Sequence, residues 1–253
     1  MEHIINLSMG KDSMAMTILM LEKHWPIDRV MFADVGEDAE FEETYEVRSR
    51  TERLLGISIE TVRSNIWTWD KIFYSYPTRG KHKDEIRGFP PTVGPGCRYR
   101  SWLKTDVLDA SRGNGNTIYI GIAADEAHRA QAKMYQDKNN IFRFPLIEWG
   151  MTEQDCFNLC KQRGLLHPLY KYFHRLGCWQ CPKQRIGSLR NLFWHFPDKW
   201  EKLQRYQDAC SWPFRPNMRV EDLAKKFIRE EDLEEQQLEW NLSKMNCKKN
   251  VSK

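Results

Sequence analysis

Apolar and polar positions follow two different rhythms along this chain. Over the first 150 residues, short apolar runs alternate with stretches whose apolar residues recur at helical spacing. The runs predict strands at Ile4–Leu7, Arg29–Asp34, Ser58–Arg63, Thr117–Ile122 and Ile141–Pro145. The stretches between them predict helices at Ser13–His24, Phe41–Leu55, Arg100–Ser111 and Asp125–Tyr135. This alternation is typical of the α/β class, with a Rossmann-like parallel sheet and helices on both faces.

After Gly150 the alternation stops and helical spacing dominates. Helices are expected at Thr152–Arg163, Gln184–His195, Asp198–Cys210 and Val220–Leu242. We therefore predict an α/β domain over residues 1–150 and a helical region over residues 151–253. The stretch Trp67–Gly96 follows neither rhythm and carries several prolines and the basic run Arg79–Lys83, which is typical of an active-site or lid loop.

Composition narrows the class of protein. The chain has 39 basic and 35 acidic residues, and the net charge of +4 is too mild to predict nucleic-acid binding by itself. No apolar run approaches the ~20 residues of a membrane span, and the amino terminus enters a strand without a signal-peptide pattern. We therefore expect a cytoplasmic protein that does not bind membranes. In that compartment the seven cysteines should be ligands, reactive groups or core residues rather than disulfides.

The turn after the first predicted strand brings together groups that bind anions. It reads Ser-Met-Gly-Lys-Asp-Ser over residues 8–13 and precedes an apolar stretch of helical period. Free N–H groups at a helix start, two hydroxyls and the Lys11 ammonium suit a phosphate or a pyrophosphate. A Walker A loop would need a glycine where Ile5 stands. The alternative is a plain helix start capped by Asp12 or Ser13.

Two later strand ends carry polar residues that should lie beside this turn. Asp34 ends the second strand, and Gly121, Glu126 and Arg129 follow the fourth. Ligands of open α/β sheets bind at the carboxyl ends of the strands, so we expect Asp34 to lie beside this turn. The alternatives are a helix-capping acidic turn at Asp34 and an i,i+4 ion pair between Asp125 and Arg129.

A C-x-x-C pair, Cys178 and Cys181, follows Gly177. This spacing lets both sulfurs of one turn reach a single metal, and the pair does not stand at a helix start after the first strand, as a thioredoxin-like motif would. We therefore predict a metal centre, with an iron–sulfur cluster or tetrahedral zinc as the alternatives. Cys156 and Cys160 lie four residues apart on a predicted amphipathic helix and are expected to be core residues.

Taken in order, these motifs resemble the PAPS reductase-like family of the PP-loop ATP pyrophosphatases (adenine nucleotide alpha-hydrolases), and in particular its iron–sulfur members. Beyond the turn at residues 8–13, the resemblance rests on D-x-G and E-T-Y within 34–45, the cysteine before a helix at 97, G-I-x-x-x-E-x-x-R at 121–129, P-L-x-x-W at 145–149, H-P-L-Y at 167–170 and G-C-x-x-C at 177–181. Met9, Val35 and Ala123 depart from the family pattern, which has glycine, threonine and arginine at these places.

The resemblance implies an adenine nucleotide with Mg²⁺ on its phosphates, and Lys11 and Asp12 as catalytic residues. The residues implied to bind the nucleotide are Ser8, Gly10, Lys11, Asp12, Ser13, Asp34, Gly121, Glu126 and Arg129. Ala123 favours ATP over PAPS, because a 3′-phosphate needs more positive charge than ATP bound with Mg²⁺. A [4Fe–4S] cluster, with zinc as the alternative, would be held by Cys97, Cys178, Cys181 and a fourth ligand that is Cys210 or a group other than cysteine.

Three functions are compatible with this family. The favoured one is an enzyme that cleaves ATP at the α-phosphate to activate a substrate for sulfur transfer, with tRNA or DNA as acceptor, a sulfur-donor protein as partner and a homodimer as the assembly. The second is a PAPS or APS reductase that makes sulfite. It is disfavoured because Cys247 lacks the Glu and Gly-x-His neighbours of the family's E-C-G-x-H motif. The third is a non-catalytic nucleotide- and metal-binding component of a complex.

Overall fold

The structure is a computed structural model that describes residues 1–80, 83–92, 96–136 and 139–250, of which 237–250 are described by their backbone alone. The chain forms two compact units. The first contains Met1–Ser75 and Pro95–Cys181, and the second contains Tyr76–Gly94 and Pro182–Lys253. The predicted boundary at residue 150 therefore falls inside the first unit.

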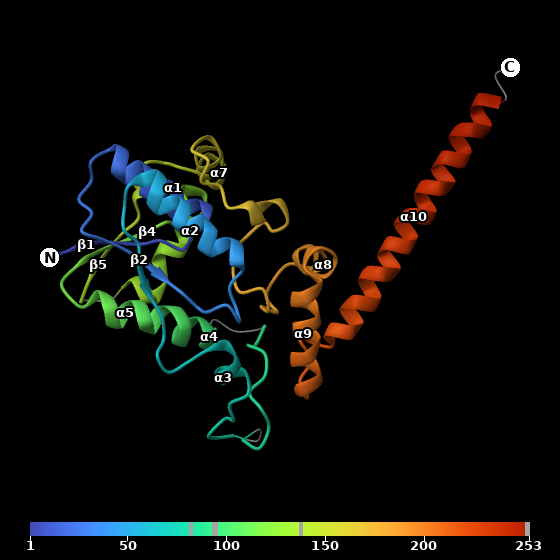
Figure 1. The fold of residues 1–253 in the computed structure, drawn as a ribbon, viewed down its shortest axis with the longest axis horizontal. Helices are drawn as coiled ribbons and strands as arrows, with labels where there is room; N and C mark the ends of the chain where they lie inside the picture. Colours follow the sequence, from blue (N-terminus) through green and yellow to red (C-terminus); the bar gives the residue numbers. More distant parts are fainter. Residues whose placement is uncertain (81–82, 93–95, 137–138, 251–253) are drawn as a thin grey trace. The chain divides into compact units, whose positions relative to one another are not determined.

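A five-stranded sheet forms the centre of the first unit (Figure 1). Its strands are β1 (His3–Asn6), β2 (Arg29–Ala33), β3 (Glu60–Val62), β4 (Thr117–Ile120) and β5 (Ile141–Arg143). All the pairings are parallel, and the order is β3-β2-β1-β4-β5. The predicted parallel sheet is confirmed, and the direction of winding reverses between β1 and β4, which is where ligands of such sheets bind.

Helices cover both faces of this sheet, as the sequence predicted (Figure 1). In β1, Ile5 packs into a core cluster with the helices α1 (Lys11–Glu22), α2 (Glu42–Leu55) and α7 (Glu153–Gln162). Its neighbour Ile4 packs into a second cluster, on the other face, with α5 (Asp106–Arg112). Adjacent residues of a strand point to opposite faces, so one apolar pair serves two cores.

The other short helices of the first unit lie in its connections. They are α3 (Trp69–Phe73), α4 (Arg98–Arg100), the π-helix η1 (Ser101–Thr105), the 3-10 helices η2 (Ala124–Gln131), η3 (Lys133–Tyr135) and η4 (Pro168–Lys171), and α6 (Pro145–Glu148). The predicted single helix over 125–135 is wrong, because its backbone leaves helical geometry at Glu126 and again at Ala132. A 3-10 helix aligns residues i and i+3, and Arg129 accordingly pairs with Glu126 rather than with Asp125.

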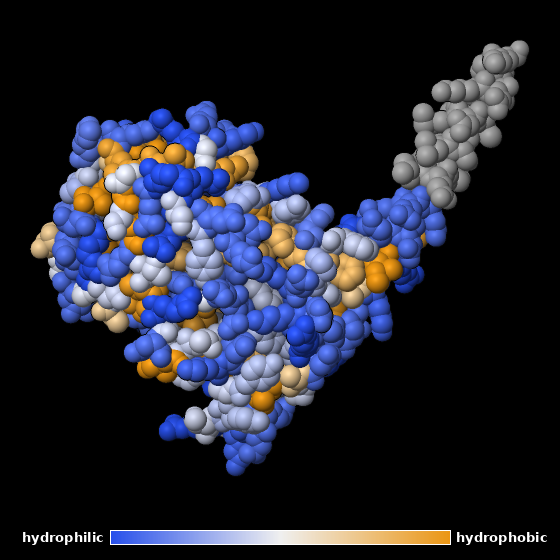
Figure 2. Space-filling view, in the orientation of Figure 1, coloured by the Kyte–Doolittle hydropathy of each residue, from blue (hydrophilic) through white to orange (hydrophobic). Residues whose placement is uncertain are grey.

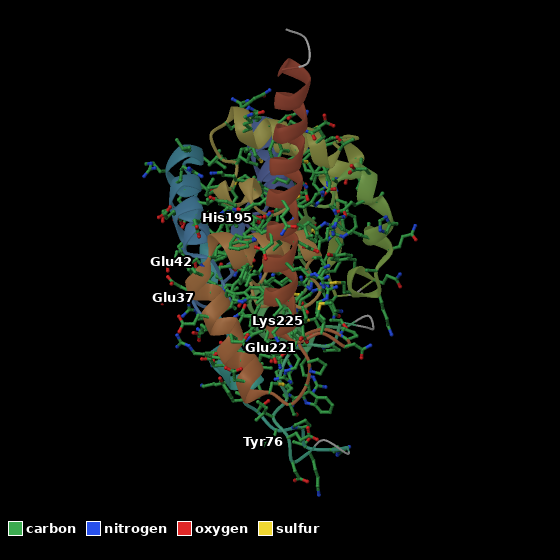
Figure 3. The ribbon with its side chains drawn as sticks, turned by 90° about the vertical axis from the view of Figure 1, so that its right-hand side faces the viewer. Glu37, Glu42, Tyr76, His195, Glu221 and Lys225 are labelled. Carbon is green, nitrogen blue, oxygen red and sulfur yellow. The ribbon has the colours of Figure 1, made fainter. Side chains whose placement is uncertain are left out.

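The second unit is helical. It contains α8 (Ile186–His195), α9 (Pro197–Ala209) and α10 (Val220–Asn250), and Glu221 and Lys225 lie on the first turns of α10 (Figure 3). Phe193, Trp200 and Phe227 meet in its aromatic core. Hydrophilic side chains cover most of the face seen in Figure 2. Among the described residues, no helix has the length and apolar content that crossing a membrane requires.

The end of β4 lies against the start of α1, and this contact depends on a missing side chain. A Cβ atom at Gly121 would lie 2.6 Å from both the nitrogen and the Cα atom of Ser13. Backbone atoms cannot move aside as the end of a flexible side chain can. Only glycine therefore fits at residue 121 without moving the start of α1.

We expect Gly121→Ala to lower the free energy of unfolding of the first unit by about 1 to 3 kcal/mol, the usual cost of an overpacked site. Urea unfolding followed by circular dichroism measures the change. Gly177→Ala is the matched control in the same unit, because a Cβ at that position meets nothing within 4 Å. An unchanged urea midpoint for Gly121→Ala would contradict the close approach.

Candidate active site

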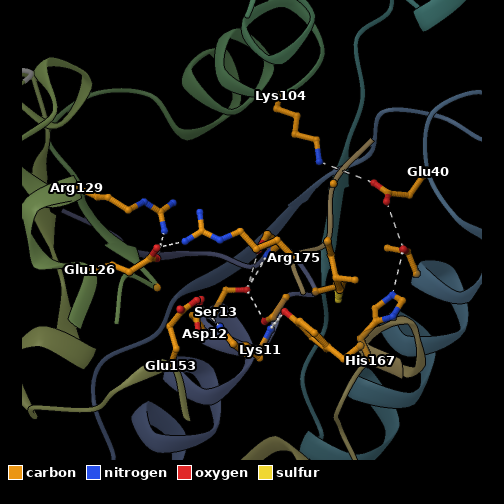
Figure 4. Close-up of a pocket in the computed structure, with 18 residues that line it drawn as sticks. Lys11, Asp12, Ser13, Glu40, Lys104, Glu126, Arg129, Glu153, His167 and Arg175 are labelled. Carbon is orange, nitrogen blue, oxygen red and sulfur yellow. Dashed lines mark hydrogen bonds and ion pairs between the residues drawn. The ribbon is translucent and has the colours of Figure 1, made fainter. Parts of the chain in front are cut away.

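A cavity of about 280 Å³ lies in the first unit, at the carboxyl ends of β1 and β4 (Figure 4). It is lined by the turn at residues 8–13, by Gly121 and by residues of several later segments. The cavity thus occupies the place where the strand order reverses, which is the usual ligand site of an open α/β sheet. The walls are rich in charged side chains.

The turn at residues 8–13 is closed by its own hydroxyl groups. The Ser8 N–H donates to Ser13 Oγ over 3.1 Å, and the Ser13 hydroxyl donates to the Gly10 carbonyl over 3.1 Å. The Ser8 hydroxyl, 2.9 Å from Ser13 Oγ, must then be the donor of that pair. The helix α1 begins after Gly10 without a side-chain cap, so neither Asp12 nor Ser13 is its N-cap.

The backbone at Met9 has a conformation that favours glycine, the residue that the family pattern has at this place. Its φ is 59°, in the left-handed region that side chains rarely adopt. Its side chain is 1 % exposed and packs into the core beneath the turn. Burial of this side chain offsets the backbone strain, and such strain is often stored at functional sites.

Lys11 stands between two carboxylates. Its Nζ lies 2.7 Å from Glu153 Oε1 and 2.9 Å from Asp12 Oδ1. Burial alone would lower the pKa of Lys11, but the two carboxylates outweigh it and the pKa is raised, so the ammonium stays charged. The backbone N–H of Lys11 donates to the hydroxyl of Tyr170 over 2.9 Å.

Three carboxylates meet at the floor of the cavity. Oxygens of Asp12, Glu126 and Glu153 all lie within 4.8 Å of one another. Burial raises the pKa of Asp12, although Lys11 opposes the shift. Glu153 is placed by the capping box of α7 at Thr152, and its N–H donates to Asp125 Oδ1 over 3.1 Å. Carboxylate oxygens are the ligands that Mg²⁺ prefers, so this donor set fits that ion.

Glu126 is also shared by two arginines. The guanidinium groups of Arg129 and Arg175 each donate to one of its carboxylate oxygens. Burial would raise the pKa of Glu126, but the two guanidinium groups lower it below the usual value. Both arginine side chains remain about half exposed, at 45 % and 56 %.

On the opposite wall, a chain of hydrogen bonds leads from a histidine to a lysine (Figure 4). The Leu169 N–H donates to His167 Nδ1 over 3.3 Å, so the neutral imidazole carries its proton on Nε2 and donates it to Thr44 over 3.2 Å. Thr44 in turn donates to Glu40 over 3.3 Å, and Glu40 lies 3.8 Å from Lys104 Nζ. Burial lowers the pKa of His167 to about 4.

Three of the four predicted metal ligands belong to the first unit. Burial raises the pKa of Cys178 to about 12, Lys104 opposes this, and the neighbouring thiols of Cys181 and Cys97 add to it. Both thiols thus act electrostatically on Cys178, whereas the group of possible metal ligands that lies within 4.8 Å among the described residues is that of Asp12, Glu126 and Glu153. Thiolates from two turns form a donor set that suits an iron–sulfur cluster or zinc. Cys210 belongs to the second unit, where its sulfur lies beside Gly88.

The sequence placed most of the cavity residues and missed others. The implied nucleotide ligands that line the cavity are Ser8, Gly10, Lys11, Asp12, Ser13, Gly121, Glu126 and Arg129. Asp34 is not one of its lining residues, because its carboxylate accepts from Arg63 over 2.6 Å and from Tyr45 over 2.8 Å. The missed charged residues and phenol are Glu40, Lys104, Glu153, Tyr170 and Arg175. Tyr170 had a signal in the H-P-L-Y motif at 167–170, which supported the resemblance but pointed to no role in the site.

Comparison with known proteins identifies the family of the chain. The sequence model of the phosphoadenosine phosphosulfate reductase domain matches residues 2–184, more than half of the chain. The chain belongs to this family. An uncharacterized protein of Methanocaldococcus jannaschii is 27% identical to this chain. The match covers 79% of this chain and 40% of that relative's length. An uncharacterized 37.8 kDa protein from the gpa 5' region of Escherichia phage 186 is 27% identical over 83% of the chain and 76% of its own.

Two solved structures are similar to this chain at low sequence identity. A phosphoadenylyl-sulfate (PAPS) reductase from Candida auris, in a phosphate complex, gives a TM-score of 0.46 with 11% identity, over 71% of this chain and 82% of that one. A U34-tRNA thiolase from Methanococcus maripaludis, with its [4Fe-4S] cluster, gives a TM-score of 0.43 with 17% identity, over 82% of this chain and 71% of that one.

His167 predicts how stability depends on pH. Its pKa of about 4 lies below the ordinary value of about 6.5 for an unfolded chain, so the unfolded state binds more protons between these two values. Its contribution to stability is therefore complete above about pH 6.5 and declines as the pH falls toward 4, by roughly 2 to 3 kcal/mol at pH 4.5.

The free energy of unfolding measured from pH 4.5 to 7.5 should rise less steeply in His167→Asn than in the wild type. His128→Asn, at an exposed histidine of the same unit, should keep the wild-type slope. Equal slopes for all three proteins would refute the argument.

Proposed function

We propose that the chain binds an adenine nucleotide in this cavity, ATP in preference to PAPS, and cleaves it at the α-phosphate to activate a substrate for sulfur transfer. One observation carries the proposal. The turn at residues 8–13, with the Lys11 ammonium, and the carboxylates of Asp12, Glu126 and Glu153 line one cavity. Such a set of groups can bind both the phosphate chain and the cation that accompanies it.

The balance of charge favours ATP. Among the described residues, the cavity is lined by four basic side chains (Lys11, Lys104, Arg129, Arg175) and four acidic ones (Asp12, Glu40, Glu126, Glu153). A triphosphate that arrives with a divalent cation supplies a partner for each set. PAPS has an additional phosphate and would need more positive charge, and Ala123, where the family has arginine, is fully buried and brings none.

The residues of the cavity can perform this reaction as follows. An oxygen of the acceptor attacks the α-phosphorus, the bond from that phosphorus to the bridging oxygen breaks, and pyrophosphate leaves with the electron pair. Asp12, Glu126 and Glu153 would hold Mg²⁺, which when bound neutralises phosphate oxygens. Lys11 stabilises the charge that develops on the leaving pyrophosphate, in a buried site where such an interaction is strong. The product is an adenylated acceptor, ready to take up sulfur.

For the cysteines we propose a [4Fe–4S] cluster bound by Cys97, Cys178 and Cys181, with Cys210 as the fourth ligand and zinc as the alternative metal. In support of this, all three cysteines belong to the first unit, and the thiols of Cys181 and Cys97 act electrostatically on Cys178. A cluster so held would supply the sulfur chemistry of the reaction.

The partners belong to the same proposal. A sulfur-donor protein and a tRNA or DNA acceptor would meet the protein in the cytoplasm, and the protein itself would be a homodimer. The basic run Arg79–Lys83 would offer the nucleic-acid backbone a contact, and its residues 81 and 82 lie outside the described residues.

Reduction of PAPS or APS to sulfite is the second candidate, favoured by the family of the domain. Its nucleophile would have to be Cys247, whose neighbours lack the E-C-G-x-H pattern. Formation of sulfite from PAPS with a thiol donor would establish this function in place of the first.

Lys11→Ala should reduce pyrophosphate release from ATP by about a hundredfold or more, because the leaving group loses its charged partner. A coupled pyrophosphate assay with Mg²⁺ and candidate acceptors measures the rate. Lys161→Ala, at an exposed lysine of α7, is the matched control and should leave the rate unchanged. The proposal fails if the wild type releases no pyrophosphate with any acceptor, or if Lys11→Ala is as active as the wild type.

Cys178→Ser should remove the metal centre. Anaerobically purified protein is expected to be brown and to carry iron, and the variant should lose its colour and most of its iron, measured by visible absorbance and metal analysis. Cys156→Ala, at a buried cysteine of α7, should keep both. Colourless wild-type protein carrying zinc would decide for the alternative metal, and Cys210→Ser tests the fourth ligand in the same way.

A further inference from the structure

Arg175 connects the cavity with the cysteines through the chain itself. It belongs to an irregular segment after η4, and Arg175, Leu176 and Gly177 all line the cavity. The next residue is Cys178. Two residues therefore separate Arg175, whose guanidinium binds Glu126 at the cavity, from the first cysteine of the C-x-x-C pair.

The far end of this segment is fixed. Trp179 and Gln180, the two residues between the cysteines, are 1 % and 0 % exposed. The side-chain amide of Gln180 donates to the carbonyl of Asp38, in the connection between β2 and α2. The turn at residues 178–181 is thus anchored on the body of the unit, whereas Arg175 is held at the cavity by its side chain.

The Arg175 side chain donates to Glu126 and could donate to a bound phosphate instead. Among the described residues, Arg175 has one hydrogen-bond partner, Glu126, and shares it with Arg129. A guanidinium has five N–H donors, and the half-exposed Arg175 keeps donors that Glu126 does not use. Glu126 in turn lies within 4.8 Å of Asp12 and Glu153. A phosphate chain that enters with a cation offers Arg175 new acceptors and offers Glu126 a new positive partner.

We propose that Arg175 binds the phosphate chain of the nucleotide and that this contact, together with the hydrogen bond from Gln180 to Asp38, holds the Cys178–Cys181 turn in place. The proposal rests on the proposed function, because it takes the nucleotide to be the ligand of the cavity. Arg129 shares the same carboxylate but belongs to η2, which does not lead to the cysteines. Arg129 should therefore add to nucleotide affinity alone, and Arg175 to affinity and to the coupling.

The test compares Arg175→Ala with Arg129→Ala by two measurements on the full-length protein. Calorimetry with ATP and Mg²⁺ gives the affinity. Hydrogen exchange followed by mass spectrometry, with and without saturating ATP, gives the protection of the amides of residues 177–181. The exchange measurement reports on backbone position whether or not a metal is bound to the thiols.

In the wild type, ATP should slow exchange at residues 177–181 by about fivefold or more, the lower end of the usual coupling between two sites. Both variants should bind ATP more weakly, by about 10- to 100-fold, since each loses one hydrogen bond to a charged group. At saturating ATP, Arg129→Ala should keep the protection of residues 177–181 and Arg175→Ala should lose it. Arg175→Lys, which keeps the charge, should recover part of it.

Two results would overturn the coupling while leaving the proposed function intact: full protection of residues 177–181 in Arg175→Ala at saturating ATP, or ATP binding by the wild type with no change in their exchange. Wild-type affinity in Arg175→Ala would overturn the phosphate contact. A wild type that binds no ATP would overturn the proposed function, and this inference with it. Unchanged thermal unfolding of the variants shows that none of these results comes from a loss of folding.

Discussion

A buried ammonium group organises the cavity. Lys11 is the first residue of α1, and Glu153 is the first residue of α7. The ion pair between them joins the starts of these two helices, which pack on a shared core. Burying charges is costly unless each has a partner, so Lys11 and the carboxylates can be there only together. Apolar packing places α7 against α1, and the ion pair sets Glu153 beside Lys11 in the cavity.

Steric constraints fix the other side of the same turn. Gly121 lets the end of β4 touch the backbone of Ser13, and Met9 accepts a left-handed backbone because its side chain fills the core below. Three contacts therefore hold the turn at residues 8–13. They are the ion pairs of Lys11, the packing of Met9 in the core and the contact of Gly121 with Ser13. A rigid turn loses little freedom when it binds a ligand, which is how preorganised sites gain affinity.

The sequence predicted the sheet and the turn between β1 and α1 because their signals are local. Short apolar runs, helical spacing and the motif at residues 8–13 each lie within a few neighbouring residues. Glu153 and Arg175 are distant in sequence from the turn that they serve, and no periodicity marks them. Asp34 shows the converse: its place at a strand end was correct, but Arg63 and Tyr45 bind its carboxylate, and no local pattern reveals such partners. The helix expected at 125–135 was wrong because the backbone leaves helical geometry at Glu126 and Ala132, and the apolar spacing of the sequence does not mark these breaks.

The course of the chain between the two units gives the cysteines a special position. The segment Tyr76–Gly94 of the second unit returns to the first unit at Pro95, two residues before Cys97, and the chain leaves the first unit again at Pro182, directly after Cys181. Two of the three covalent connections between the units thus lie beside predicted metal ligands, and Cys210 lies in the second unit. A metal bound by Cys97, Cys178 and Cys181 would link the two ends of the Pro95–Cys181 segment within the first unit, so that binding of the metal and folding of this segment would depend on each other.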